Sequence, residues 1–125
     1  MSSAPHRFPP RRRRLRAMLA GGLLAVATQG AVGAPTSLAA QTAALKAAKP
    51  GVPCEAVDAA ARKVIEDAGF GPGYKFFTHR VGHGMGMDGH EWPYLVKGNT
   101  LPLAPGMVFS DEPGIYITGE FGVRL

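Results

Sequence analysis

Residues 76–84 read FFTHRVGHG, and the character of the chain changes there. The aromatic and β-branched residues of this stretch favour an extended strand, and its glycines allow a close approach of backbone. The residues before it repeat with helical spacing, whereas the residues after it form short β-type runs. This order predicts an α+β fold, with two helices followed by antiparallel strands.

The first helix is predicted over residues 36–48, TSLAAQTAALKAA, because alanine is the strongest helix former. Thr36 or Ser37, directly after Pro35, is suited to cap its start. The segment KPGVP at residues 49–53 is expected to end it, since proline and glycine interrupt helices.

The second helix is predicted over about residues 53–68, with Pro53 in its first turn and Gly69 at its C-terminal cap. One apolar stripe runs along it at helical spacing, formed by Ala56, Val57, Ala60, Ala61, Val64, Ile65 and Ala68. The charged residues are expected to lie mostly off that stripe, namely Glu55, Asp58, Arg62, Lys63 and Glu66.

Two or three short strands are predicted near the C-terminus. The runs MVFS (107–110), IYIT (115–118) and FGVRL (121–125) are rich in β-branched and aromatic residues. Pro-Gly and Thr-Gly-Glu sequences separate them, which predicts tight turns between antiparallel strands.

Residues 1–35 resemble a secretory signal. The basic sequence HRFPPRRRRLR precedes an uncharged, mostly apolar run of 11 residues (17–27), and Val32-Gly33-Ala34 offers small residues at cleavage spacing. The run is too short to span a bilayer, so no stable membrane span is expected. A functional signal implies a periplasmic or secreted protein, and its absence a cytoplasmic one. Accidental upstream translation of a GC-rich gene is the open alternative.

The net charge of +5 does not indicate a nucleic-acid surface. Six of the 14 basic residues lie before Ala17, and the remainder of the chain carries eight basic against nine acidic residues. A nucleic-acid-binding domain needs its lysines and arginines on the folded part. We therefore expect no nucleic-acid partner. Cys54 is the single cysteine, which excludes an intrachain disulfide.

Three of the four histidines lie between residues 79 and 90. If residues 79–83 are extended, then His79, Val81 and His83 point to the same face. Imidazole nitrogens and carboxylate oxygens, such as that of Glu112 in the sequence DEPG, are the usual ligands of manganese, cobalt and zinc. His90 is too far from His83 for a helical pair, but a turn can return it as a proton donor.

The sequences THRVGHGMGMDGHEWPYL (78–95) and LAPGMVFSDEPGIYITGEFGVRL (103–125) together resemble the C-terminal half of the pita-bread metallopeptidases. That family includes Xaa-Pro aminopeptidases, prolidases, methionine aminopeptidases and creatinases. The sequence GHEWPYLVKGN favours the Xaa-Pro peptidase and prolidase branch. Residues 36–125 are accordingly predicted to be a partial metallopeptidase catalytic domain with a partial pita-bread fold.

The resemblance implies a role for five residues. His83 and Glu112 match metal ligands, His90 matches a histidine that contacts substrate and stabilises the reacting centre, His79 matches a histidine of the substrate pocket, and Arg124 matches an arginine that supports the catalytic network. The implied cofactor is a divalent metal pair, with manganese favoured over cobalt or zinc. The implied substrate is a proline-containing peptide.

The chain departs from the family pattern in its ligands. The family uses two aspartates, one histidine and two glutamates, but no acidic residue precedes position 50 here and the sequence ends at Leu125. Only His83 and Glu112 remain. We therefore expect a fragment that hydrolyses no Xaa-Pro bond by itself. Its uncovered sheet edge and apolar face predict marginal stability, aggregation or a need for a partner, and a homo-oligomer is one possible form.

Two other functions stay open at this point. A non-catalytic pseudoenzyme that binds peptides or proteins would use the same fold, although it has no need of His83, His90 and Glu112. A creatinase-like amidinohydrolase would also share the fold, but creatinases work without the metal pair.

Overall fold

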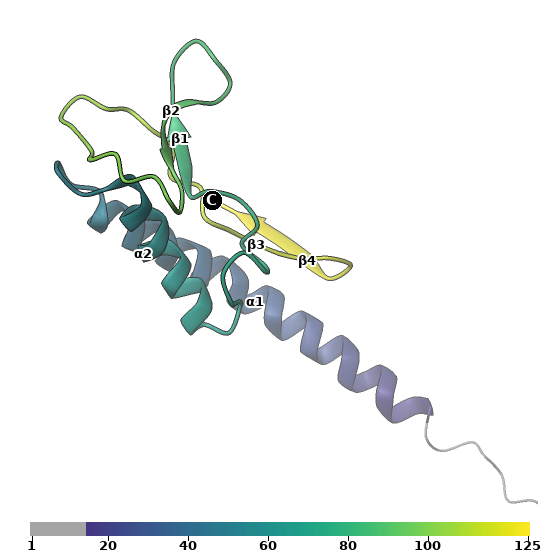
Figure 1. Ribbon diagram of the computed structural model, residues 1–125. Helices are drawn as coiled ribbons and strands as arrows, with labels where there is room; N and C mark the ends of the chain where they lie inside the picture. The colour runs from purple at the N-terminus through teal and green to yellow at the C-terminus, as the bar shows by residue number, and fades with distance from the viewer. Residues whose placement is uncertain (1–14) are drawn as a thin grey trace, which may run out of the picture.

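The computed structural model describes residues 15–125, with side chains from residue 31 onward. In chain order the elements are α1 (Leu15–Ala47), α2 (Cys54–Asp67), β1 (Gly82–Gly84), β2 (Glu91–Leu95), β3 (Gly114–Ile117) and β4 (Phe121–Arg124). The C-terminal part of α1 lies beside α2, and the two hairpins stand on one side of this helix pair (Figure 1). The predicted order of two helices followed by antiparallel strands is confirmed.

The first helix is longer than predicted. It begins at Leu15 rather than at residue 36 and continues through Pro35. The expected capping role of Thr36 and Ser37 is therefore wrong, because both residues lie inside the helix. The Thr36 hydroxyl donates to the Val32 carbonyl at 2.8 Å, as a helical threonine does. The split of the chain at residue 35 stays a prediction, and residues 1–14 lie outside the described part.

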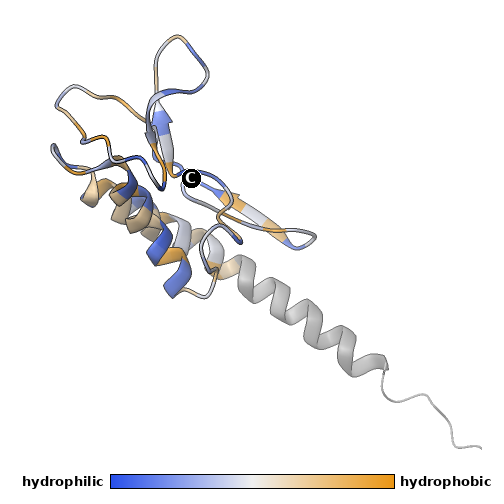
Figure 2. Cartoon of the chain, viewed as in Figure 1, coloured by the Kyte–Doolittle hydropathy of each residue, from blue (hydrophilic) through white to orange (hydrophobic). Residues whose placement is uncertain are grey.

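The second helix agrees with its prediction at both ends. Pro53 is its N-cap residue, and Ala68 is its C-cap. Gly69 follows with a φ of 88°, a left-handed conformation that suits glycine after a helix. Along α2, hydrophilic and hydrophobic residues follow each other in turn (Figure 2).

The buried face of α2 differs from the predicted stripe. Its buried residues are Cys54, Val57, Asp58, Ala61, Arg62 and Ile65. Asp58 and Arg62 were expected off the apolar stripe, yet they are only 1% and 7% exposed. They can be buried because they form an ion pair with each other, 2.9 Å between Nη2 and Oδ1.

The strands form two antiparallel hairpins. In one, Gly82 pairs with Leu95 and His83 with Tyr94. In the other, β3 pairs with β4 around the predicted Thr-Gly-Glu turn, with Ile115 opposite Val123. The prediction of strands at 115–118 and 121–125 is thus confirmed to within a residue or two.

The structure differs from the predicted strands in three details. Only residues 82–84 of the run 76–84 form a strand. The run MVFS makes a single bridge, from Phe109 to Gly84. Strand β2, residues 91–95, was not predicted, and it contains Pro93, a residue that is uncommon inside strands.

One hydrophobic core joins both helices to both hairpins. Its largest fully buried side chains are Phe77, Ile65, Leu95, Ile115, Val57 and Val81. Among the described residues, no helix combines the length and the apolar character that crossing a membrane requires.

Candidate functional site

The site is built around the GHG sequence of β1, which lies between two other segments. On one side, the Val81 amide donates to the Leu95 carbonyl at 3.1 Å. On the other side, the Ser110 amide donates to the His83 carbonyl at 2.8 Å and the Glu112 amide donates to the Val81 carbonyl at 2.7 Å. This antiparallel pairing places Glu112 beside His83, although 29 positions separate them in the sequence.

Glycine is required on both sides of His83 because backbone lies against it. A Cβ on Gly82 would come within 1.9 Å of the Ser110 carbonyl oxygen. A Cβ on Gly84 would come within 1.9 Å of the Trp92 carbonyl oxygen. No side chain fits at such distances, so the two glycines allow three segments to meet.

His83 and Glu112 are in direct contact. The His83 Nε2 atom lies 3.0 Å from Glu112 Oε1, and the two side chains are 16% and 26% exposed. The His83 Nδ1 atom lies 2.8 Å from the Gly84 carbonyl oxygen. Because a carbonyl only accepts, Nδ1 carries a proton, and a neutral ring then turns the lone pair of Nε2 toward the carboxylate.

Two acceptors that face each other at this distance need a positive charge. Either the imidazole takes a second proton or a cation lies against both atoms. One imidazole nitrogen and one carboxylate oxygen are donors that manganese, cobalt and zinc accept, so the pair fits a divalent ion. Within residues 15–125, however, no group of three or more His, Cys, Asp or Glu side chains is arranged to bind a metal ion.

The carboxylate of Glu112 is kept ionised. A side-chain hydrogen bond from Ser110 is the largest influence that lowers the pKa of Glu112, and the positive charge of Arg124 and the rings of His83 and His79 lower it further. The Arg124 Nη1 atom lies 3.4 Å from Glu112 Oε2. The His83 amide donates to the Ser110 Oγ at 3.1 Å, and the Ser110 hydroxyl also lies 3.4 Å from the His83 carbonyl oxygen, which can accept from it. Glu112 therefore carries a full negative charge at neutral pH.

All five residues singled out from the sequence line one pocket of about 240 Å³. Its lining consists of His79, Arg80, Gly82, His83, His90, Glu112 and Arg124. The exposed ring of His90 lies edge-on to that of His83, with 4.3 Å between the ring centroids. Val81 was expected on the same face as His79 and His83, but it is fully buried in the core instead.

His79 also lines the pocket, and both of its ring nitrogens have hydrogen-bond partners. Its Nδ1 is 2.7 Å from the Arg80 carbonyl oxygen, and its Nε2 is 3.0 Å from the Tyr116 hydroxyl. These two contacts fix the orientation of the imidazole ring.

Helix α1 contacts the segment on both sides of Glu112. The buried hydroxyl of Ser37 donates to the Pro113 carbonyl at 2.6 Å. The Gln41 side-chain amide, one helical turn later, donates to the Asp111 carbonyl at 3.0 Å. The backbone that carries Glu112 is therefore bonded to α1 on one side and to Val81 on the other.

Sequence reasoning missed two residues of the site, Ser110 and Tyr116. Both lie an even number of positions from Glu112, so a period of two along an extended segment places all three on one face. Gly114 was the other available signal, because a Cβ there would come within 2.6 Å of the Tyr116 hydroxyl. The glycine leaves room for the ring that orients His79.

Known proteins are similar to this chain in sequence over most of its length. The probable dipeptidase PepE of Mycobacterium tuberculosis is 55% identical over 86 residues, which are 69% of this chain and 22% of that protein. The Xaa-Pro dipeptidase of Lactobacillus helveticus is 54% identical over 86 residues, 69% of this chain and 23% of that protein.

Solved structures agree with the sequences. The crystal structure of dipeptidase PepE from Mycobacterium ulcerans superposes with a TM-score of 0.68 at 52% identity, covering 73% of this chain and 24% of that one. The prolidase from Pyrococcus furiosus gives a TM-score of 0.68 at 42% identity, covering 73% and 26%. The predicted partial pita-bread fold is confirmed. The chain spans about a quarter of the length of these relatives.

The sequence profile of metallopeptidase family M24 matches residues 34–125, nearly three quarters of the chain. The resemblance to the pita-bread metallopeptidases is therefore confirmed, and the chain belongs to metallopeptidase family M24.

Proposed function

We propose that this chain forms one part of the metal site and substrate pocket of an Xaa-Pro peptidase, an aminopeptidase or dipeptidase that cleaves the bond before proline. The observation that carries the proposal is the contact of His83 Nε2 with Glu112 Oε1 at 3.0 Å, inside a pocket that also holds His79, His90 and Arg124. The names of the relatives, Xaa-Pro dipeptidase and prolidase, support this substrate class over a creatinase-like one.

The proposed cofactor is a divalent pair, with manganese favoured and cobalt or zinc as alternatives. His83 and Glu112 would bind it through Nε2 and Oε1. When bound, divalent ions polarise the scissile carbonyl and activate water. Arg124 orients Glu112 through its Oε2 atom, and it also limits the negative charge that the pocket would otherwise concentrate.

The histidines supply the remaining chemistry of the pocket. His90 is exposed and close to His83, where it can donate to an oxyanion as negative charge develops. His79 has its Nε2 occupied by Tyr116, so we assign it to the shape and polarity of the substrate pocket rather than to proton transfer.

We also propose that the 125-residue chain hydrolyses no Xaa-Pro bond by itself. Two donors do not hold a pair of divalent ions, and the loss of even one outer partner of a metal site weakens binding by about 10- to 100-fold.

Metal binding tests the site in the chain itself. Manganese(II) should broaden the imidazole NMR signals of His83 in the parent chain, and the effect should be lost in Glu112→Gln. Glu120→Gln is the matched control, because Glu120 is exposed at the turn between β3 and β4. Equal broadening in the parent and in Glu112→Gln would remove Glu112 from the site. Xaa-Pro turnover that His83→Ala abolishes would contradict the proposed inactivity.

A chimera tests the function in a complete fold. The matching 86-residue segment of the Lactobacillus helveticus Xaa-Pro dipeptidase is replaced by the segment of this chain. We expect the chimera to hydrolyse dipeptides that end in proline, and His83→Ala to abolish turnover. A chimera that folds and binds manganese but shows no turnover would contradict the proposed function. Peptide binding that persists in chelator would favour the pseudoenzyme.

A further inference from the structure

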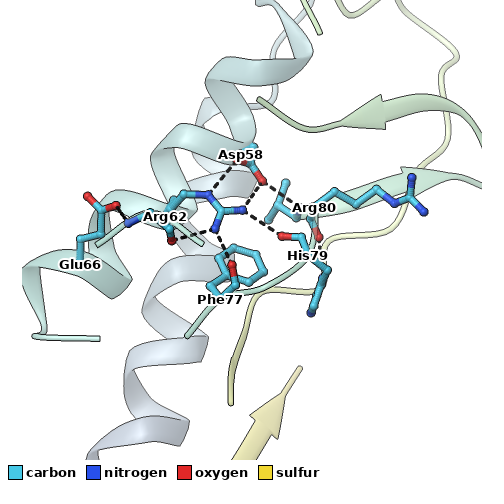
Figure 3. Close-up of polar contacts among 8 residues, drawn as sticks. Asp58, Arg62, Glu66, Phe77, His79 and Arg80 are labelled. Atoms are coloured by element: carbon cyan, nitrogen blue, oxygen red, sulfur yellow. Dashed lines mark hydrogen bonds and ion pairs between the residues drawn. The ribbon is translucent and has the colours of Figure 1, made fainter. Parts of the chain in front are cut away.

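An ion pair is buried in the core of this protein on the face of α2 that points toward the site. The Arg62 Nε donates to Asp58 Oδ2 at 3.0 Å, and Nη2 donates to Asp58 Oδ1 at 2.9 Å (Figure 3). Both residues are almost inaccessible. A buried ion pair is weak evidence for stability, because the desolvation of two charges offsets their attraction. The other hydrogen bonds of Asp58 and Arg62 indicate a different role for the pair.

Arg62 uses its remaining donors on the segment that leads into the site. Nη1 donates to the carbonyls of Gly73 at 3.1 Å and Phe77 at 2.6 Å, and Nη2 donates to the carbonyl of His79 at 2.9 Å. The guanidinium carbon lies 4.2 Å from the centre of the Phe77 ring. All five N–H groups of Arg62 are thus engaged, three of them with backbone between residues 73 and 79. Lysine cannot reproduce this planar fork.

Asp58 extends the network from α2 to Glu112. Its Oδ1 accepts from the Val81 amide at 3.0 Å, and the Val81 carbonyl accepts from the Glu112 amide at 2.7 Å. Two successive hydrogen bonds therefore connect the helix to the backbone of the candidate metal ligand. Figure 3 shows that the ion pair, whose two residues both belong to α2, faces the segment that carries His79.

We propose that Asp58 and Arg62 are positioning residues of the site. Arg62 fixes the position of His79 by donating to the backbone carbonyl of His79. Asp58 fixes the position of the Val81 amide, and the contact between His83 and Glu112 depends on the placement of Val81. Apolar side chains could fill the same volume, but they would leave the carbonyls of Gly73, Phe77 and His79 without the Arg62 donors. They would also remove one of the two acceptors of the Val81 amide, which is shared between Asp58 Oδ1 and the Leu95 carbonyl. The functional meaning of the pair rests on the function proposed above, whereas its geometric effect does not.

Amide hydrogen exchange of the full 125-residue chain tests the proposal. Asp58→Ala should speed exchange at the amides of Val81 and Glu112 by about 10-fold, the equivalent of one lost hydrogen bond. The amides of the β3–β4 hairpin should exchange at the parent rate. The through-space NMR contact between the His83 ring and the Glu112 side chain should weaken in the same variant.

Two further variants separate positioning from general stability. Asp58→Asn keeps an oxygen for the Val81 amide and should restore slow exchange at Glu112. Lys63→Gln is the matched control, because the exposed Lys63 side chain forms an i,i+4 ion pair with Asp67 on the same helix. It should leave exchange at the site unchanged.

The proposal is overturned if Asp58→Ala speeds exchange equally at the site and in the hairpin, or at neither. If Asp58→Ala does not fold, Arg62→Lys tests the proposal instead. This variant keeps the positive charge opposite Asp58 but loses the planar guanidinium that bonds to the carbonyls of residues 73–79. It should weaken the contact between the His79 ring and Tyr116 while the β3–β4 hairpin stays protected, and an unchanged contact would overturn the proposal. Neither readout uses a metal ion or a peptide, so failure here is distinguishable from failure of the proposed function.

Discussion

The substitution Gly82→Ala tests how the site is assembled, because it adds one methyl group between two backbones. The new Cβ would lie 1.9 Å from the Ser110 carbonyl oxygen, whereas real Cβ atoms essentially never come closer than 3.0 Å to such an atom. The segment that carries Ser110 and Glu112 must therefore move away by more than 1 Å.

The magnitude follows from the contacts that this movement breaks. The hydrogen bonds from the Ser110 amide to the His83 carbonyl and from the Glu112 amide to the Val81 carbonyl measure 2.8 and 2.7 Å, and neither survives such a shift. Each lost bond costs about 1 to 2 kcal/mol when its groups stay partly buried. We expect Gly82→Ala to lower the free energy of unfolding by about 2 to 4 kcal/mol, within the range of overpacked cores.

Urea denaturation followed by far-UV circular dichroism measures this change. With a denaturant slope of about 2 kcal/mol/M, the midpoint should fall by about 1 to 2 M. Gly89→Ala is the matched control from the same glycine-rich stretch, because a Cβ there meets nothing within 4 Å. It should change stability by less than about 0.5 kcal/mol. Equal midpoints for Gly82→Ala and Gly89→Ala would refute the reasoning.

Three other substitutions have expected outcomes in the same assay. Ser37→Ala leaves the Pro113 carbonyl without its buried donor and should cost about 1 to 3 kcal/mol, whereas Thr42→Ala, an exposed hydroxyl on the same helix, should cost little. Burial raises the pKa of Asp111 to about 6, so stability is lost as pH rises from 3.8 through 6. Asp111→Asn should therefore be more stable than the parent at pH 7 by about 1 to 2 kcal/mol, after allowance for solvent screening, and no more stable below pH 4; equal midpoints at pH 7 would contradict this. The pKa of Glu112 is lowered instead, so its contribution is present above the unfolded pKa and is lost as pH falls through the folded value. Glu112→Gln should flatten the acid limb of the stability profile, and an unchanged limb would contradict the assignment.

The elements that the sequence predicted well are those whose signals are local. Helix α2 has a proline at its start, an apolar period of 3.6 and Gly69 after its end, and each of these acts within one or two turns. The β3–β4 hairpin likewise follows from alternation and its turn. The start of α1 was wrong because a local reading treats Pro35 as a boundary, whereas the observed helix continues through it.

The sequence predicted the main residues of the candidate site but not the residues that hold them in position. A histidine between two glycines and a glutamate before Pro-Gly are visible in the sequence, and the structure places both in one pocket. Ser110 and Tyr116 were missed, because their value depends on which neighbours face them across strands. Asp58 and Arg62 were expected off the apolar stripe, and their burial could not be predicted because it depends on backbone carbonyls of residues 73–79.

The sequence by itself determined the family, the order of the elements and the side chains able to bind a metal ion, because these depend on residue identity and short-range spacing. The tertiary structure alone decided which glycines must be glycine, which ion pair is buried and how His83 meets Glu112. Those outcomes depend on contacts between segments far apart in the chain, such as Ser37 with Pro113, which are 76 positions apart. No local pattern encodes a contact whose partner is set by the packing of the whole chain.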